Sequence, residues 1–190
     1  MADPRPLPAM VLTDTSGEPF DLVADTAGSV RLLFFGFTHC PDICNIQLAQ
    51  LQQVLARPGA PANVDLLFVT VDPERDTPAV IRAYLDRFST DFVGLVAEPD
   101  QLTRLANEVG AYAAVRQYDT GSTTPAHDHD AGAGHGHDGD GGAAGYEVGH
   151  DARVFAFAPD GVGYTQYPHP TRQSQYDHDL PLLAAIGARA

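Results

Sequence analysis

The stretch VRLLFFGFTHCPDIC, Val30–Cys44, joins a long apolar run to both cysteines of the chain. Apolar residues at consecutive positions, rather than at alternate ones, indicate a strand that is buried on both faces, as strands of a parallel sheet are. The cysteines follow this strand directly, at the kind of strand-to-helix turn where an open parallel sheet places its ligand crevice. The stretch therefore predicts an α/β fold with a chemically active site at one edge of its sheet.

Apolar runs and helical patterns alternate along the rest of the chain, which places this strand in a series of βα units. Ser16 and Gly17 form the predicted turn of an N-terminal hairpin. The other expected strands are 64–71, 92–96 and one on each side of the turn 159–161, and the expected helices are 40–57, 77–88 with Thr77 as cap, 100–109 and 179–188. The order is hairpin, βαβαβα, loop, ββα. We therefore expect one thioredoxin-like domain over residues 1–190, with helices flanking a central mixed sheet.

The composition limits the classes of protein to which the chain can belong. Its 190 residues carry a formal net charge of −14 and every basic residue is an arginine, so we expect no nucleic-acid partner, which would need a basic face. The longest apolar run, Val30–Phe37, is far shorter than the ~20 residues that cross a bilayer. The first ten residues lack the charged and apolar regions of a secretory signal. These features predict a globular domain without a membrane span.

The two cysteines are four residues apart, a spacing that places both side chains on one face of a helix if Cys40 lies at its start. A helix N-terminus favours thiolate over thiol, which raises both nucleophilicity and metal affinity. The pair is thus compatible with a disulfide, a redox couple and part of a metal site. Plain packing is the fourth interpretation, because cysteine is often a core residue and Cys44 lies on the apolar face of the expected helix. Cys44 should then be the less exposed of the two.

A metal held by two thiolates needs a further ligand, and His150 is the best candidate in the sequence. It stands shortly before the apolar run VFAFA, and if that strand lies beside the first one, the preceding turn faces the cysteines. Two thiolates and one imidazole suit copper, as Cu(I) or Cu(II), better than magnesium or calcium. Zinc is an alternative, although a structural zinc site takes a fourth protein ligand that the sequence does not offer. The other alternative is an ordinary loop histidine.

Residues 119–145 differ abruptly from the rest of the chain, because this segment contains no Leu, Ile, Val, Phe or Tyr. Such a composition predicts a flexible surface loop inserted into the domain. Its clustered histidines, which stand among aspartates, are candidates for an auxiliary metal site that recruits copper. The alternative is a solvated insertion in which they are incidental. These residues are His127, His129, His135 and His137.

Asp72 ends the second predicted core strand, on the edge where the cysteines are expected. It could support the site by orienting a ligand or a partner, although a strand-end aspartate more often serves the turn itself. Arg75 and Glu74 are expected to form a surface pair. His169 and His178 are expected to lie on the surface near the C-terminal helix.

Three ordered motifs closely resemble the Sco/SenC family of copper chaperones. They are GFTHCPDIC, VTVDPERDTP and a histidine before VFAFAPDG, and the resemblance extends from Met10 to Ile186. It implies a thioredoxin-like fold that holds one copper ion and transfers it to the copper A site of cytochrome c oxidase. By motif position, the family's copper ligands correspond to Cys40, Cys44 and His150. Asn45 departs from the proline that the family often has after the second cysteine, and this change removes no ligand.

The resemblance also implies partners and a location. The expected partner is the copper A subunit of cytochrome c oxidase, with another copper chaperone or a thioredoxin-like reductant as further candidates. Family members commonly face the periplasm, the outside of the cytoplasmic membrane or the mitochondrial intermembrane space. We therefore expect an extracytoplasmic protein whose N-terminal anchor is absent from this chain. A thiol-disulfide role is attributed to the same family, and in that alternative Cys40 and Cys44 form a redox pair that reduces the oxidase cysteines.

Other functions fit the motif less well. Dedicated thioredoxin-like oxidoreductases use CxxC, and CxxxC departs from that pattern toward metal binding. A peroxiredoxin would have a threonine three residues before its reactive cysteine, whereas Phe37 and Pro41 occupy these positions. Copper storage or sensing stays open as an interpretation.

Overall fold

Strand β4 (Val30–Gly36) is the centre of the fold, since all 7 of its residues are buried. It pairs in parallel with β5 (Val64–Thr70), which pairs in parallel with β6 (Val93–Val96). The large sheet has the strand order β1-β10-β9-β4-β5-β6-β2-β3, in which the other pairings are antiparallel. The central mixed sheet predicted from the sequence is confirmed.

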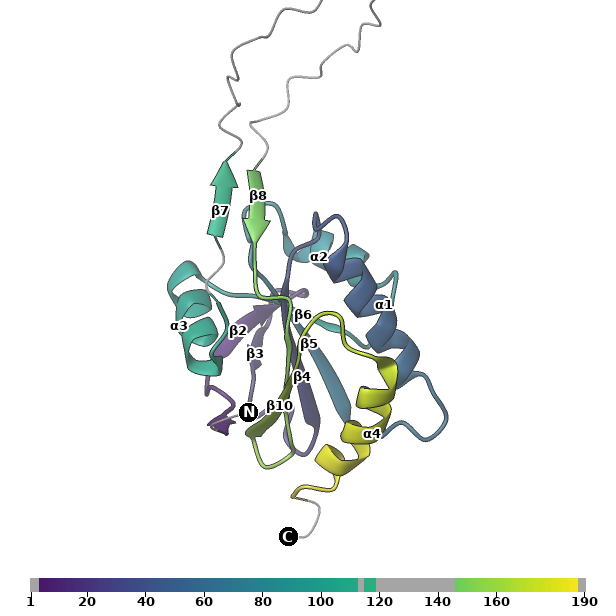
Figure 1. The fold of residues 1–190 in the computed structure, drawn as a ribbon. Helices are drawn as coiled ribbons and strands as arrows, with labels where there is room; N and C mark the ends of the chain where they lie inside the picture. Colours follow the sequence, from purple (N-terminus) through teal and green to yellow (C-terminus); the bar gives the residue numbers. More distant parts are fainter. Residues whose placement is uncertain (1–3, 113–114, 119–145, 188–190) are drawn as a thin grey trace, which may run out of the picture.

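The computed structural model describes residues 4–112, 115–118 and 146–187 (Figure 1). Strand β9 pairs with β4 on the side opposite β5, and the predicted N-terminal hairpin, β2 with β3, pairs with β6. The flanking strands are β1 (Arg5–Pro6), β2 (Val11–Asp14), β3 (Pro19–Asp21), β9 (Val154–Phe157) and β10 (Val162–Tyr167). The expected histidine-rich loop, 119–145, lies outside the described residues.

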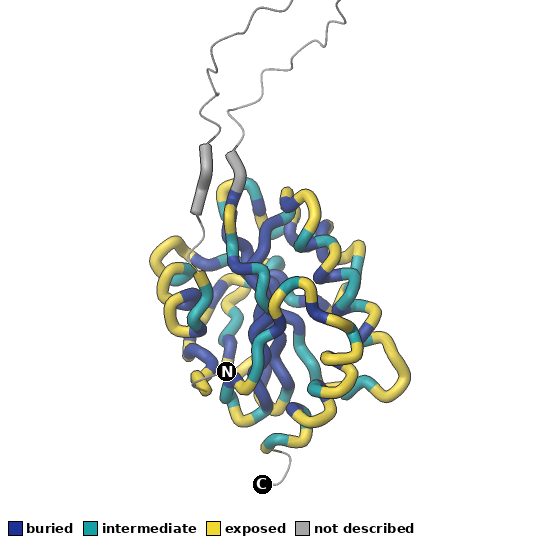
Figure 2. The backbone as a smooth tube through the Cα atoms, in the orientation of Figure 1, coloured by how far each residue is buried: buried dark blue, intermediate teal, exposed yellow. Residues whose placement is uncertain are grey.

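Helices pack on both sides of the sheet, with α1, α2 and α4 on the right in Figure 1 and α3 on the left. Their bounds are α1 (Ile43–Leu55), α2 (Pro78–Leu85), α3 (Pro99–Val109) and α4 (Gln173–Ala184). The predicted cap of α2 is confirmed, because Thr77 Oγ1 accepts a hydrogen bond from Val80 N at 3.4 Å. Figure 2 shows the outcome of this layering: buried positions follow the central strands, and exposed positions follow the outer helix faces.

Two helix starts differ from the predictions by three or more residues, while α3 begins one residue earlier than expected. Helix α1 begins at Ile43 and not at Cys40, because a residue before proline is disfavoured in the helical conformation and Pro41 follows Cys40. Helix α4 begins at Gln173, six residues before the predicted start at Asp179. The first turns of α4 are polar, so no apolar pattern indicated a helix there. Tyr176 is nevertheless fully buried, and its ring centre lies 4.1 Å from that of Tyr167.

Other boundaries also differ, and three strands were not predicted, β1 among them. Helix α1 ends at Leu55 and α2 at Leu85, two and three residues earlier than expected. A separate antiparallel ribbon, β7 (Val115–Tyr118) with β8 (Tyr146–Gly149), leads away from the main sheet (Figure 1). His150 directly follows the end of β8 and precedes the short segment that enters β9.

Candidate metal centre

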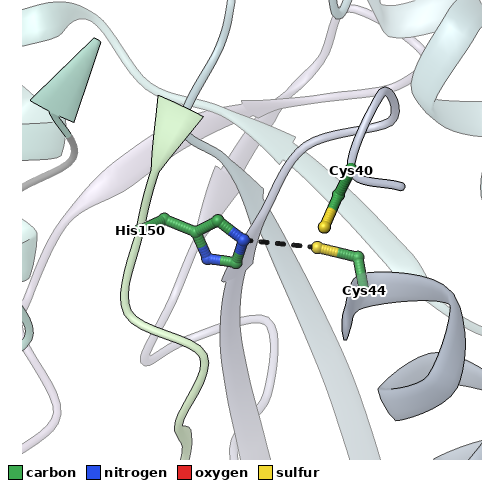
Figure 3. Close-up of side chains that lie close together, drawn as sticks. All are labelled: Cys40, Cys44 and His150. Carbon is green, nitrogen blue, oxygen red and sulfur yellow. Dashed lines mark hydrogen bonds between the residues drawn. The ribbon is translucent and has the colours of Figure 1, made fainter. Parts of the chain in front are cut away.

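Three side chains that are distant in sequence meet at the C-terminal end of β4 (Figure 3). The sulfur atoms of Cys40 and Cys44 and a ring nitrogen of His150 all lie within 4.8 Å of one another. Both cysteines are buried and unbridged, and His150 is half-buried. Among the residues that the structure describes, this is the one cluster of at least three His, Cys, Asp or Glu side chains close enough to share a metal ion. The structure therefore brings together the three ligands that the sequence proposes.

Cys44 is positioned by helix α1 and by the space that a glycine leaves. It is the second residue of the helix and its exposed fraction is 0%. A Cβ atom at Gly36 would lie 3.1 Å from Cys44 Sγ and 2.6 Å from a ring carbon of Phe68. A real Cβ does not approach a buried ring so closely. Glycine at the end of β4 is thus what admits the sulfur beneath the loop.

Cys40 lies on the loop between β4 and α1. Its backbone N–H donates to the Phe37 carbonyl at 3.2 Å, and its own carbonyl accepts a hydrogen bond from Asn45 Nδ2 at 3.3 Å. Asn45 is the residue that departs from the family pattern, and a proline there would have no side-chain donor. This asparagine therefore ties the first turn of α1 back to the loop that carries Cys40.

Asp76 organises the same loop, and the sequence analysis missed it. Its carboxylate is fully buried and accepts hydrogen bonds from Thr38 N at 3.0 Å, Thr38 Oγ1 at 2.6 Å and Thr70 Oγ1 at 2.7 Å. It thereby fixes the loop before Cys40 against the end of β5. The sequence holds only a weak signal for this role, because Asp72 and Asp76 share one motif and only contacts with distant threonines distinguish them.

Asp72 is also buried, and it serves both the turn and a neighbouring arginine. Its backbone carbonyl accepts hydrogen bonds from the N–H groups of Arg75 and Asp76, which is the turn role that the sequence favours. Its carboxylate forms an ion pair with Arg75. The Arg75 guanidinium lies 5.9 Å from the centre of the Phe37 ring. Asp72 therefore acts at the edge of the site by holding Arg75.

The imidazole of His150 is oriented by contacts on both ring nitrogens. Nδ1 lies 3.1 Å from the Asp151 carbonyl oxygen, and Nε2 lies 3.5 Å from Cys44 Sγ. Because a carbonyl can only accept, the Nδ1 atom carries the proton in this hydrogen bond and leaves the Nε2 lone pair directed at the cysteines. The Phe37 ring meets the imidazole edge to face, with 5.4 Å between ring centres. This tautomer is the one that a metal ion beside the sulfur atoms requires.

The two thiols differ strongly in acidity. The hydrogen bond from the Cys44 thiol outweighs the effect of burial and lowers the pKa of Cys40 to about 4, and the backbone N–H groups of Cys44 and Asp42 add to this effect. The same hydrogen bond, with burial and the charge on Cys40, raises the pKa of Cys44 far above its usual range. At neutral pH the metal-free pair is therefore one thiolate and one thiol. The thiolate is Cys40.

A pocket of about 460 Å³ opens beside the cluster. Cys40 and His150 line this pocket together with the Arg75 side chain, whereas Cys44 lies behind them. Its remaining walls are mainly apolar, with Phe37 and Val148 among them. Of the three candidate ligands, Cys40 and His150 are therefore the two that a molecule in the pocket can contact.

The other histidines singled out in the sequence lie elsewhere. The candidates for an auxiliary site, His127, His129, His135 and His137, are outside the described residues. His178 is exposed, with 74% of its side chain accessible, as predicted. His169 was predicted to lie on the surface, but it is half-buried. The protein encloses its Nδ1 atom.

Known proteins share this sequence pattern. A family model described as SCO1/SenC matches residues 7–184. The mitochondrial SCO2 homologue of Bos taurus is 34% identical over 156 residues, which cover 80% of this chain and 50% of the relative. The chain spans about half the length of the curated relatives it matches.

Solved structures show the same fold. ScoI of Bradyrhizobium japonicum with copper bound has a TM-score of 0.67 and 27% identity, and the match covers 95% of this chain and 98% of that one. Apo Sco1 of Thermus thermophilus has a TM-score of 0.68 and 29% identity, with 98% and 94% covered. The predicted thioredoxin-like fold class is thereby confirmed. Within the described residues, no helix has the length and apolarity that crossing a bilayer demands.

Proposed function

Because this chain belongs to the SCO1/SenC family, we propose that it binds one copper ion as cargo through Cys40, Cys44 and His150 and delivers it to the copper A site of cytochrome c oxidase. The observation that carries the proposal is the convergence of two sulfur atoms and one imidazole nitrogen within 4.8 Å. The copper-bound relative from Bradyrhizobium japonicum, which the chain matches over nearly its whole length, supports copper as the cargo.

The donor set favours copper over the other common ions. Soft thiolate ligands select Cu(I) and zinc, while magnesium and calcium require oxygen ligands. Three donors satisfy trigonal Cu(I), and with one weak additional ligand they satisfy Cu(II). A structural zinc site would need a fourth protein ligand. Among the described residues the cluster contains only these three.

Delivery requires that the cargo be reached from outside, and the pocket provides that access. Since Cys40 and His150 line it, a ligand of the receiving protein can enter next to both. Cys44, at the buried end, would be the last donor to be replaced. We propose the copper A subunit as the receiver and an extracytoplasmic location, anchored to a membrane by a part of the protein that precedes this domain. Electron-transport membranes are where such a receiver resides.

The alternative function is reduction of the oxidase cysteines, and the acidity difference within the pair favours it. The Cys40 thiolate would attack one sulfur of the partner disulfide, forming a mixed disulfide and releasing the other partner sulfur as a thiolate. Cys44 would then attack Cys40 and give up its proton to the released thiolate. The second partner sulfur leaves as a thiolate, so the partner ends with one thiol and one thiolate while Cys40 and Cys44 become a disulfide.

One set of measurements tests both functions. Copper stoichiometry and spectroscopy are measured on the wild type, Cys40→Ser, Cys44→Ser and His150→Ala. Tight binding that survives the loss of both cysteines would refute the chaperone proposal, and an unchanged site in His150→Ala would refute the third ligand. Mixing the loaded protein with an isolated copper A domain, and the reduced protein with the oxidised domain, separates copper transfer from disulfide reduction.

We also propose that His127, His129, His135 and His137 recruit copper for the main centre. Imidazoles separated by glycine and aspartate bind Cu(II) at moderate affinity, and their segment precedes His150 in the chain. Deleting residues 121–144 should slow copper loading without changing the stoichiometry of the tight site. An unchanged loading rate would overturn this role.

A further inference from the structure

We propose that Gln47 is a positioning residue that sets the distance between the helix of Cys44 and the segment of His150. The inference rests on the proposed function, because its consequence is measured as copper affinity. Gln47 lies three residues after Cys44 in α1, and its exposed fraction is 0%. Its Nε2 donates a hydrogen bond of 2.9 Å to the carbonyl oxygen of Ala152, two residues after His150. One side chain thus joins the two elements that carry the proposed ligands.

This hydrogen bond joins the two elements without using any of the proposed ligand atoms. Among the described residues, two hydrogen bonds join α1 to the segment 148–153: Gln47 to Ala152, and Cys44 to His150. The second one uses Cys44 Sγ and His150 Nε2, the two atoms that would bind a metal ion. When these atoms bind metal the second hydrogen bond is lost, and the Gln47 contact remains.

The histidine segment has other anchors, and they lie on its opposite side. Asp151 accepts a hydrogen bond from the backbone N–H of Tyr112 at 3.0 Å, just beyond α3. Arg153 pairs with Asp151 and donates to the Gly110 carbonyl at 2.9 Å. These contacts hold the segment against the end of α3. They do not fix the distance between this segment and α1. That distance is set by Gln47 and by the packing of aromatic rings around the imidazole.

The incomplete pairing of Gln47 argues against a purely stabilising role. Its Oε1 atom is buried and has no hydrogen-bond partner among the described residues. Leaving a buried polar atom unpaired is unfavourable, and this offsets part of what the hydrogen bond to Ala152 contributes to folding. What an apolar residue would lack is the hydrogen bond to Ala152. We therefore assign to Gln47 the role of holding the proposed ligands in their binding geometry before the metal binds. Such preorganisation raises the metal affinity, because the ligands need less ordering on binding.

The test uses Gln47→Met, which keeps the length of the side chain and removes the donor, with Gln50→Met as the matched control. Gln50 lies one turn further along α1, and its Nε2 also donates to a backbone carbonyl, that of Thr171, away from the centre. Cu(I) affinity is measured by competition with a colorimetric chelator. We expect Gln47→Met to weaken binding about three- to tenfold, the equivalent of one net hydrogen bond, and Gln50→Met to leave it unchanged.

Two further measurements separate positioning from general stability. In a His150→Ala background the Gln47 substitution should have no additional effect on copper affinity. In the metal-free protein, the NMR signals of the His150 ring should shift and broaden in Gln47→Met and stay unchanged in Gln50→Met. Equal affinities of Gln47→Met and Gln50→Met, or an undiminished effect without His150, would overturn the inference. A wild type that binds no copper would instead refute the proposed function, while the NMR comparison would still decide the role of Gln47.

Discussion

The cysteine side and the histidine side of the centre are held in place by different means. The cysteines lie on one continuous segment, in which β4 ends, a short loop follows and α1 begins, with Asp76 fully buried beneath the loop. His150 is 106 residues away from Cys44 in sequence and reaches it from the end of an isolated ribbon. A local segment supported by a buried carboxylate can hold its geometry alone. A distant segment depends on each tertiary contact that it makes.

The largest expected effect comes from removing the proposed ligands, one on each side. Cys44→Ser should lower Cu(I) affinity by at least about a hundredfold, more than the loss of a residue that only supports a ligand. His150→Ala should lower it less, because two thiolates suffice to hold Cu(I) in linear coordination. Chelator competition on both variants checks the order. Equal losses would show that the histidine side contributes as much as the cysteine side and would break the comparison.

Asp76→Ala tests how the cysteine side is supported. The substitution leaves the Thr38 N–H and the Thr70 hydroxyl without their buried acceptor, and we expect the free energy of unfolding to fall by about 2 kcal/mol. Urea denaturation measures this change. The control is Asp86→Ala, which removes an aspartate that is 45% exposed and pairs with Arg82 on the surface. That exposed pair should contribute under about 1 kcal/mol. Similar losses in the two variants would contradict a special role for Asp76.

The sequence could predict the cysteine side far better than the histidine side. The apolar run before Cys40 and the helical spacing after it are local signals, and they indicated β4, α1 and the burial of Cys44. His150 was found because its residue type completes a ligand set and because it stands before the apolar run VFAFA, but the sequence could only assume that this run lies beside β4. Asp76 and Gln47 gave no usable signal, because their partners, Thr38, Thr70 and Ala152, become neighbours only after the sheet forms.

The pKa difference within the cysteine pair predicts selective alkylation by iodoacetamide. A pKa of about 4 keeps Cys40 ionised across the range from pH 5 to 8, so its rate should change by less than about threefold there, while that of a free thiol rises nearly tenfold per pH unit. Cys44 should react much more slowly throughout. Mass spectrometry of the modified peptides assigns the sites. In Cys44→Ala, which removes the thiol donor, the rate at Cys40 should regain its pH dependence.

Asp151→Asn probes the weaker anchoring of the histidine side and should have the smallest effect, about 1 kcal/mol of unfolding free energy at pH 7. Burial raises the pKa of the Asp151 carboxyl, but hydrogen bonds from Arg153 and from the Tyr112 N–H outweigh it, so the folded-state pKa lies below that of the unfolded chain. The carboxylate therefore contributes stability that is complete above the unfolded pKa and is lost as pH falls through the folded one. The difference between wild type and variant, measured by urea denaturation, should shrink as the pH is lowered from 7 to 3.5. A difference that stays constant would mean that asparagine disturbs the segment by its shape and not by its missing charge, and the histidine side would then depend on packing more than on this ion pair.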